Sequence, residues 1–166
     1  MKVYSFPPVV SEKSLVLILG TMPGRASLQA NEYYAHEQNA FWKILFLIFN
    51  QPFSKIYSEK TRLIINNSLS IWDTLKYCER PGSLDSSIKN EVPNDINGLL
   101  NIYPGIRHVI FNGKQAEKFY HKYNNKNDKI TLHTMPSTSP ANAKISNADK
   151  IARWSIIKTL TDINQP

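Results

Sequence analysis

Leu15-Val16-Leu17-Ile18-Leu19 is a run of five apolar residues, and the turn Gly20-Thr21-Met22-Pro23-Gly24 follows it directly. A continuous apolar run of this length is typical of a parallel strand that is covered on both faces. Such folds bind their ligands at the carboxyl ends of the strands, so we expect a pocket beside the turn. Gly20 and Gly24 permit tight backbone geometry there, and Pro23 stiffens the path.

Strand-like and helix-like segments alternate along the rest of the chain, which predicts an α/β layered fold. The predicted strands are residues 15–19, 69–72, 108–111 and 129–133. The predicted helices are residues 40–49, 59–67, 113–121 and a last helix that begins at the capping-box pattern Ser146-Asn147-Ala148-Asp149. The proline, glycine and polar residues of 79–93 indicate a long surface connection.

Composition predicts one soluble globular domain over residues 1–166. The chain has 166 residues, of which 42% are apolar, and this is enough for one core but short for two. The 20 Lys and Arg residues exceed the 13 Asp and Glu residues, giving a net charge of +7 that favours a polyanionic partner such as nucleic acid. No apolar run approaches the roughly 20 residues that span a bilayer, so no membrane association is expected.

Cysteine usage limits the chemistry further. The single cysteine, Cys78, excludes an intrachain disulfide, a multi-cysteine zinc site and a cysteine-ligated iron–sulfur cluster. The reducing cytoplasm is the expected location. The four histidines show no paired spacing of the helical metalloprotease type, so we expect neither a metal ion nor a cofactor.

The turn at residues 20–24 allows two interpretations. It is not a Walker phosphate loop, because three residues rather than four separate its glycines and Arg25-Ala26 follows in place of Lys-Ser or Lys-Thr. It could be a plain turn from strand to helix. Alternatively, its backbone N–H groups could line a pocket and stabilise a developing anion.

An aromatic cluster surrounds the start of the helix at 40–49. Phe41 and Trp42 lie on the periodic apolar face of that helix, which favours core packing. Tyr33 and Tyr34 precede it, and for them packing and stacking on a planar ligand are both open.

Two polar residues accompany these aromatic side chains. Asn39 immediately precedes the helix, where an asparagine ordinarily caps the first turn. Its amide could also orient a water molecule through the carbonyl oxygen, although it is too weak a base for strong proton abstraction. His36 could donate a proton or contact phosphate, or it could be purely structural.

A third cluster, Met135-Pro136-Ser137-Thr138-Ser139-Pro140-Ala141-Asn142-Ala143, follows the last predicted strand. Its prolines bracket small hydroxyl residues, which predicts a rigid loop that projects from the surface. The loop could be an ordinary connection, or a wedge or phosphate clamp that presses against a duplex.

Taken in order, these motifs resemble the uracil-DNA glycosylase superfamily. The resemblance extends over nearly the whole chain and is closest to the hypoxanthine-DNA glycosylase branch, the sixth family, whose members remove deaminated adenine from DNA. The motifs that carry it are Gly20-Thr21-Met22-Pro23-Gly24, Tyr34-Ala35-His36, Asn39-Ala40-Phe41-Trp42-Lys43, Gly113-Lys114-Gln115-Ala116 and Pro136-Ser137-Thr138-Ser139-Pro140.

This resemblance implies a three-layer α/β/α sandwich around a central, mostly parallel four-stranded sheet. It implies a monofunctional DNA glycosylase that excises deaminated bases, chiefly hypoxanthine and with uracil or xanthine as further candidates, in base excision repair. The enzyme would flip the base from the duplex and hydrolyse the N-glycosidic bond. A monomer is expected, acting on double-stranded DNA that contains a deaminated base, with single-stranded DNA as a second candidate.

Two departures from the better-known branches point to the catalytic residue. Those branches carry a water-binding Asp or Asn where this chain has Met22, and the most efficient uracil enzymes carry a His where it has Met135. A methionine side chain cannot polarise water. In the hypoxanthine branch the role falls to the asparagine of the Asn-x-Phe-Trp motif, which is Asn39 here.

The resemblance therefore predicts a catalytic residue, a base pocket and a DNA-binding loop. The catalytic residue is Asn39. The pocket residues are Gly20, Thr21, Met22, Pro23, Gly24, Tyr34 and His36, and the loop residues are Pro136, Ser137, Thr138, Ser139, Pro140 and Asn142. Tyr34 would stack on the flipped base, and the amides of Thr21 and Met22 would stabilise the departing base.

Three alternatives remain open at the level of sequence. One is a mismatch-type uracil-DNA glycosylase. The second is a nucleotide-binding hydrolase or transferase that uses the turn at 20–24 for phosphate. The third is a non-catalytic module that binds damaged or regulatory nucleic acid.

Overall fold

A four-stranded parallel sheet forms the centre of the molecule in the computed structural model, which describes residues 1–162. The strands are β3 (Leu69–Asp73), β2 (Val16–Gly20), β6 (His108–Asn112) and β7 (Thr131–Met135), in that spatial order, and every neighbouring pair is parallel. The predicted sheet is confirmed. Its last strand begins two residues later than predicted, because Lys129 and Ile130 still belong to the preceding connection.

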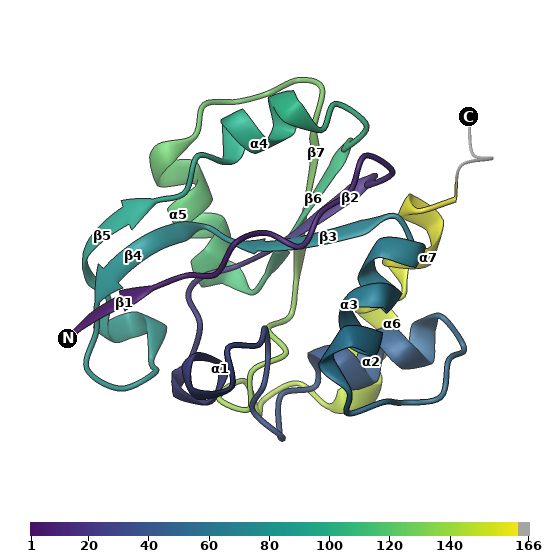
Figure 1. Ribbon diagram of the computed structural model, residues 1–166, viewed down its shortest axis with the longest axis horizontal. Coiled ribbons are helices and arrows are strands. Elements are labelled where there is room, and N and C mark those ends of the chain that lie inside the picture. The colour runs from purple at the N-terminus through teal and green to yellow at the C-terminus, as the bar shows by residue number, and fades with distance from the viewer. Residues whose placement is uncertain (163–166) are drawn as a thin grey trace.

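Helices cover both faces of this sheet, as Figure 1 shows. One face contacts α2 (Phe41–Ile48), α3 (Tyr57–Asn66), α6 (Asn147–Trp154) and α7 (Ile156–Leu160), and the other contacts α4 (Ile96–Ile102) and α5 (Lys114–Tyr123). Along β2, Val16 and Ile18 belong to the first core, whereas Leu17 and Leu19 belong to the second. This alternation explains the continuous apolar run and confirms the three-layer sandwich.

The predicted helices are present with small shifts at their ends. The predicted capping box is confirmed, because the Ser146 hydroxyl accepts a hydrogen bond from the Asp149 N–H at 3.1 Å. The helix that follows is interrupted at Ser155, where α6 ends and α7 begins. The short helices α1 (Arg25–Ala30) and α4 were not predicted; with six and seven residues they are too short for a clear helical period.

A second sheet lies beside the first and corrects the sequence prediction for residues 79–93. It contains β1 (Lys2–Tyr4), β4 (Leu75–Glu79) and β5 (Lys89–Pro93) in the order β1-β4-β5, with antiparallel pairing. The prediction of a surface connection is therefore wrong at both ends of this range. Between β4 and β5 the chain is irregular, except for the short 3-10 helix η1 (Asp85–Ser87). β5 was missed because its sequence, Lys-Asn-Glu-Val-Pro, has residues that are depleted in strands and no apolar alternation.

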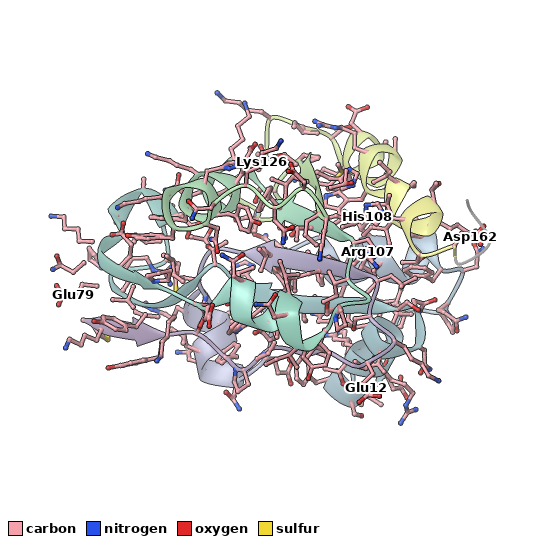
Figure 2. The ribbon with its side chains drawn as sticks, turned by 90° about the horizontal axis from the view of Figure 1, so that it is seen from above. Glu12, Glu79, Arg107, His108, Lys126 and Asp162 are labelled. Atoms are coloured by element: carbon pink, nitrogen blue, oxygen red, sulfur yellow. The ribbon has the colours of Figure 1, made fainter. Side chains whose placement is uncertain are left out.

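The second sheet extends the molecule away from the amino end of the central sheet. Figure 2 shows Glu79, the last residue of β4, at the far end of the molecule from Arg107 and His108, where β6 begins. Over residues 1–162, every helix is too short or too polar to cross a membrane.

Candidate active site

A pocket of about 1250 Å³ lies at the carboxyl edge of the central sheet. All four strands contribute their last residue to its lining: Gly20, Asp73, Asn112 and Met135. The edge where parallel strands end is where α/β folds bind ligands, and the sequence placed a pocket here. The structure brings all the predicted site residues to this one pocket, namely Gly20, Thr21, Met22, Pro23, Gly24, Tyr34, His36, Asn39, Pro136, Ser137, Thr138, Ser139, Pro140 and Asn142.

The turn at residues 20–24 is fixed through its carbonyl groups. The Gly20 carbonyl accepts from the Thr74 N–H at 2.9 Å, and the Thr21 carbonyl accepts from the Leu75 N–H at 3.3 Å. Within residues 1–162, the N–H groups of Thr21 and Met22 donate to no other group. These two donors are therefore available to an anion in the pocket.

A buried arginine holds this turn against the opposite segment of the pocket. Arg80 is 1% exposed, and its guanidinium donates to the Pro23 carbonyl and the Ser83 carbonyl and pairs with Asp85 at 3.3 Å. The Arg25 N–H also donates to the Ser83 hydroxyl at 2.9 Å. Arg80 therefore fixes the separation of two pocket segments without lining the pocket itself.

Met22 contributes an apolar surface and no polar group. Its side chain is buried and belongs to a core cluster with Leu75, Cys78 and Phe119 at the second sheet. Met135 is likewise buried, in the main core. Neither residue can hold a water molecule for reaction.

Tyr34 lies in the pocket with a backbone conformation that is rare outside glycine, at φ 53°. Its ring stacks on Phe41 with centroids 3.9 Å apart, and Phe41 and Trp42 are buried in the core as predicted. Tyr33 is structural, because its buried hydroxyl donates to the Pro7 carbonyl at 2.8 Å. Within residues 1–162, the Tyr34 hydroxyl is buried without a hydrogen-bond partner of normal geometry, and the Asn112 side chain is near enough to oppose the rise that burial causes in its pKa.

Asn39 stabilises the start of α2, but it is not the N-cap residue that its position predicted. The residue that caps the helix is Ala40, and the Asn39 Oδ1 atom accepts from the N–H of Phe41, two residues on, at 3.0 Å. This bond shows which terminal atom of the amide is the oxygen, because only an oxygen can accept it. The second lone pair of Oδ1 and the Nδ2 group are left for other partners. Asn39 can therefore stabilise the helix start and hold a water molecule at the same time.

His36 lies at the exposed side of the pocket. Its Nδ1 atom accepts from the Gln38 N–H at 3.2 Å, and its carbonyl accepts from the Asn39 N–H at 2.8 Å. These two bonds fix the backbone conformation of residues 36–39, the segment that ends at Asn39.

The loop at residues 136–142 is tied down by its own polar groups. Thr138 is fully buried and exchanges two hydrogen bonds of 2.9 Å with the Asn112 side chain. The Asn142 side chain donates to the Ser137 carbonyl at 3.1 Å, while Pro140 is exposed. Hydrogen bonds within the loop and to Asn112 therefore hold its backbone in place.

Two side chains of helix α6 donate hydrogen bonds to backbone carbonyl groups of this loop. The Trp154 indole N–H donates to the Pro136 carbonyl at 2.9 Å, and Lys150 Nζ donates to the Asn142 carbonyl at 2.9 Å. Both side chains are buried. The loop and the last helices therefore form one packed unit.

The loop also requires a glycine at the start of α5. Gly113 has φ 95°, and a Cβ atom there would lie 2.9 Å from the Ser137 Cβ. We expect Gly113→Ala to lower the free energy of unfolding by about 1–3 kcal/mol, measured by urea denaturation. Gly82→Ala is the control, because Gly82 also has positive φ, 73°, but has nothing within 4 Å. Equal losses in the two variants would show that the contact with Ser137 is unimportant.

Charge is distributed unevenly around the pocket. Four exposed cations lie along its lining: Arg25, Lys114, Lys144 and Arg153. Two carboxyl groups, those of Asp73 and Asp85, also line it. Burial, and then the charge of Asp85, raise the pKa of Asp73 to about 7, while Arg80 opposes this rise. Burial also raises the pKa of Asp85, against the effects of Thr21 and Arg80.

The polar pocket residues that sequence reasoning missed include Asp73, Asn112 and Asp85. Asp73 and Asn112 end strands β3 and β6, so the reasoning that singled out Gly20 after its strand could have found them. Asp85 lies in the segment that was interpreted as a surface connection, and nothing in the sequence marks it. Among residues 1–162, no three His, Cys, Asp or Glu side chains lie close enough together to hold a metal ion.

Known proteins resemble this chain in both sequence and structure. The profile of the Uracil DNA glycosylase superfamily matches residues 7–161. A hypoxanthine DNA glycosylase of Methanosarcina barkeri is 35% identical over 120 residues, which are 72% of this chain and 76% of that protein. Another, of Methanosarcina acetivorans, is 29% identical over 153 residues, covering 92% of this chain and 95% of that protein.

A solved structure has the same fold. The solution NMR structure of a candidate uracil DNA glycosylase from Methanosarcina acetivorans superposes with a TM-score of 0.82 at 29% identity, over 98% of this chain and all of that one. Fold and sequence agree, and the chain belongs to the uracil DNA glycosylase superfamily.

Proposed function

We propose that this DNA glycosylase excises deaminated bases, chiefly hypoxanthine, from double-stranded DNA as a monomeric and monofunctional enzyme. The observation that carries the proposal is the single pocket at the carboxyl edge of the sheet, which is lined by Tyr34, Asn39 and the loop at 136–142. The two Methanosarcina relatives named hypoxanthine DNA glycosylase support the choice of base.

The base would be flipped from the duplex into this pocket, since the glycosidic carbon is inaccessible within the stack. One face of the Tyr34 ring is already stacked on Phe41, so its other face is the one that a planar base can contact. The free N–H groups of Thr21 and Met22 would stabilise negative charge on the departing base.

Water would then be held by Asn39. Met22 and Met135 occupy the two positions where related enzymes carry polar catalytic groups, and both are buried apolar side chains here. An amide suffices if the base departs before most of the attack, because the sugar then resembles an oxocarbenium ion that needs a placed water molecule and little base assistance.

DNA would be held along the outer edge of the pocket. The exposed cations Arg25, Lys114, Lys144 and Arg153 can neutralise phosphates, which gives affinity without sequence preference. The rigid loop at 136–142 with its exposed Pro140 can press into the space left by the flipped base.

Release of free base from defined duplexes tests the proposal. Duplexes with one deoxyinosine, deoxyuridine or deoxyxanthosine are incubated with the protein and then heated in alkali, which cleaves the strand at abasic sites. We expect cleavage to be fastest for deoxyinosine and to require the alkali step, because the proposed reaction uses water as the nucleophile and forms no covalent intermediate with a lysine.

Each alternative has its own outcome in this assay. Faster release of uracil would favour a mismatch-type uracil enzyme. Tight binding with intact DNA would favour a non-catalytic module, and magnesium-dependent release of phosphate from free nucleotides would favour the nucleotide hydrolase.

A further inference from the structure

Two residues that line the pocket each carry a buried polar atom without a hydrogen-bond partner among residues 1–162. Within residues 1–162, the buried side-chain atoms that lack a partner are Tyr34 Oη, Asp73 Oδ2, Thr74 Oγ1 and Arg80 Nε. Tyr34 and Asp73 belong to the pocket lining. Because buried polar atoms are nearly always paired in folded proteins, these two atoms indicate groups that a ligand completes.

The Asp73 carboxyl and the Tyr34 hydroxyl converge above Gly20. A Cβ atom at Gly20 would lie 2.6 Å from Asp73 Oδ1 and 3.0 Å from Tyr34 Oη. Glycine therefore leaves room for both oxygen atoms at the carboxyl end of β2. The two groups come from separate parts of the chain and meet at the carboxyl end of β2.

Among residues 1–162, Asp73 has no ion-pair partner, although the buried Arg80 is near. The Arg80 guanidinium is engaged by Pro23, Ser83 and Asp85, and no hydrogen bond joins it to Asp73. Asp73 is 4% exposed, and burial together with Asp85 raises its pKa to about 7. A large fraction of Asp73 therefore carries a proton at neutral pH.

The other titratable groups around Asp73 do not compete as proton donors. Burial and the charge of Asp73 raise the pKa values of both Tyr33 and Tyr34, so these hydroxyl groups keep their protons. The Asp85 carboxyl is paired with the Arg80 guanidinium at 3.3 Å. Asp73 is thus the group around Gly20 that can give up a proton near neutral pH.

We propose that Asp73 is a further catalytic residue, the general acid that donates a proton to a ring nitrogen of the departing purine. This assignment rests on the proposed function. As the bond from C1′ to N9 breaks, its electron pair stays with the base, and the Asp73 proton moves to N7, so neutral hypoxanthine leaves. The water molecule gives its oxygen to C1′, and a proton from it returns to the Asp73 carboxylate through solvent. No oxidant, metal ion or other reactant is needed.

The dependence of single-turnover hypoxanthine release on pH tests this assignment. For the wild type we expect the rate constant to fall as pH rises above about 7, by about 10-fold per pH unit, because the acid form of Asp73 is lost. Asp73→Asn should lower the rate at pH 6 by about 100-fold and give a flat profile between pH 6 and 8.5.

A second variant provides a test that does not depend on changing Asp73. Asp85→Asn removes a neighbouring negative charge, so the pKa of Asp73 should fall and the descending limb should move to lower pH. Asp128→Asn is the matched control, because this side chain is 83% exposed, pairs with Lys126 and lies outside the pocket. Its profile should equal that of the wild type.

Unfolding by urea at several pH values supplies a readout without substrate. A carboxyl whose pKa is raised by folding makes the folded state lose stability as pH rises from about 4 to about 7, since the unfolded state releases its proton first. The midpoint of the wild type should fall over this window, and that of Asp73→Asn should fall less.

The outcomes separate the two claims. An Asp73→Asn variant that keeps the descending limb, or an Asp85→Asn variant that does not move it, would overturn the role of Asp73 alone. A wild type that releases no hypoxanthine at any pH would overturn the proposed function and, with it, the reaction assigned to Asp73.

Discussion

Asn39→Ala is expected to reduce single-turnover release of hypoxanthine by at least about 100-fold while leaving the fold intact. The Asn39 side chain is half-buried in the pocket lining, and its Nδ2 group and one Oδ1 lone pair have no hydrogen-bond partner in the described part of the chain. Alanine removes the water-holding amide. It also removes the hydrogen bond to the Phe41 N–H, at a cost of about 1 kcal/mol in the free energy of unfolding.

Two further variants separate these effects. Asn39→Asp keeps an acceptor for the Phe41 N–H and oxygen atoms that can hold water, so it should retain more activity than Asn39→Ala at equal stability. Asn101→Ala makes the same truncation on the exposed surface of α4 and should change nothing. Release at the wild-type rate by Asn39→Ala would rule out the water-holding role.

Trp154→Ala is expected to cause the largest loss of stability, about 3–5 kcal/mol in the free energy of unfolding. Trp154 is fully buried, its ring meets Phe41 edge-on at 6.0 Å, and its indole N–H donates to the Pro136 carbonyl. The Trp154 side chain thus packs against Phe41, on which Tyr34 stacks, and it also holds the loop at 136–142 through a hydrogen bond. Urea denaturation measures the effect, and it is large relative to the total stability of an ordinary domain.

Trp154→Phe isolates the contribution of the indole N–H. It keeps an aromatic ring but leaves the Pro136 carbonyl unpaired, which should cost about 1–3 kcal/mol and weaken binding to an undamaged duplex. Trp72→Phe is the matched control, because the Trp72 indole also donates to a carbonyl, that of Phe6, at 3.0 Å, but outside the pocket lining. Equal DNA affinity in the two variants would contradict a role for Trp154 in placing the loop.

The central sheet was predictable because it is buried on both faces. Three of its strands, β2, β3 and β6, are largely apolar and buried, and a run such as Val16–Gly20 has one main use in a chain of this length. The fourth strand, β7, is more polar and more exposed, and its predicted bounds were shifted by two residues. The second sheet was not predictable, because β1 and β5 are short, half-exposed and polar and gain their stability from pairing with β4. Strand pairing between segments that are distant in the sequence requires no periodic pattern of apolar residues in either segment.

The pocket was predictable where motifs lie next to strands and helices, as at Gly20 and Asn39. What could not be predicted is the environment of a residue once the chain has folded. Asp73 is an ordinary aspartate in sequence, and its raised pKa arises from burial and from Asp85, which lies on a different segment. Electrostatic effects of this kind depend on distances that only the fold creates.

The support of the loop at 136–142 by α6 has a consequence for synthesis of the chain. The turn at 20–24, Asn39 and the loop itself all precede Trp154 in the order of translation, yet the Pro136 and Asn142 carbonyls find their donors only on α6. A nascent chain can therefore form the strands and most of the pocket before the loop has its support. The loop gains these two hydrogen bonds only when residues 147–154 have left the ribosome and Trp154 has packed against Phe41.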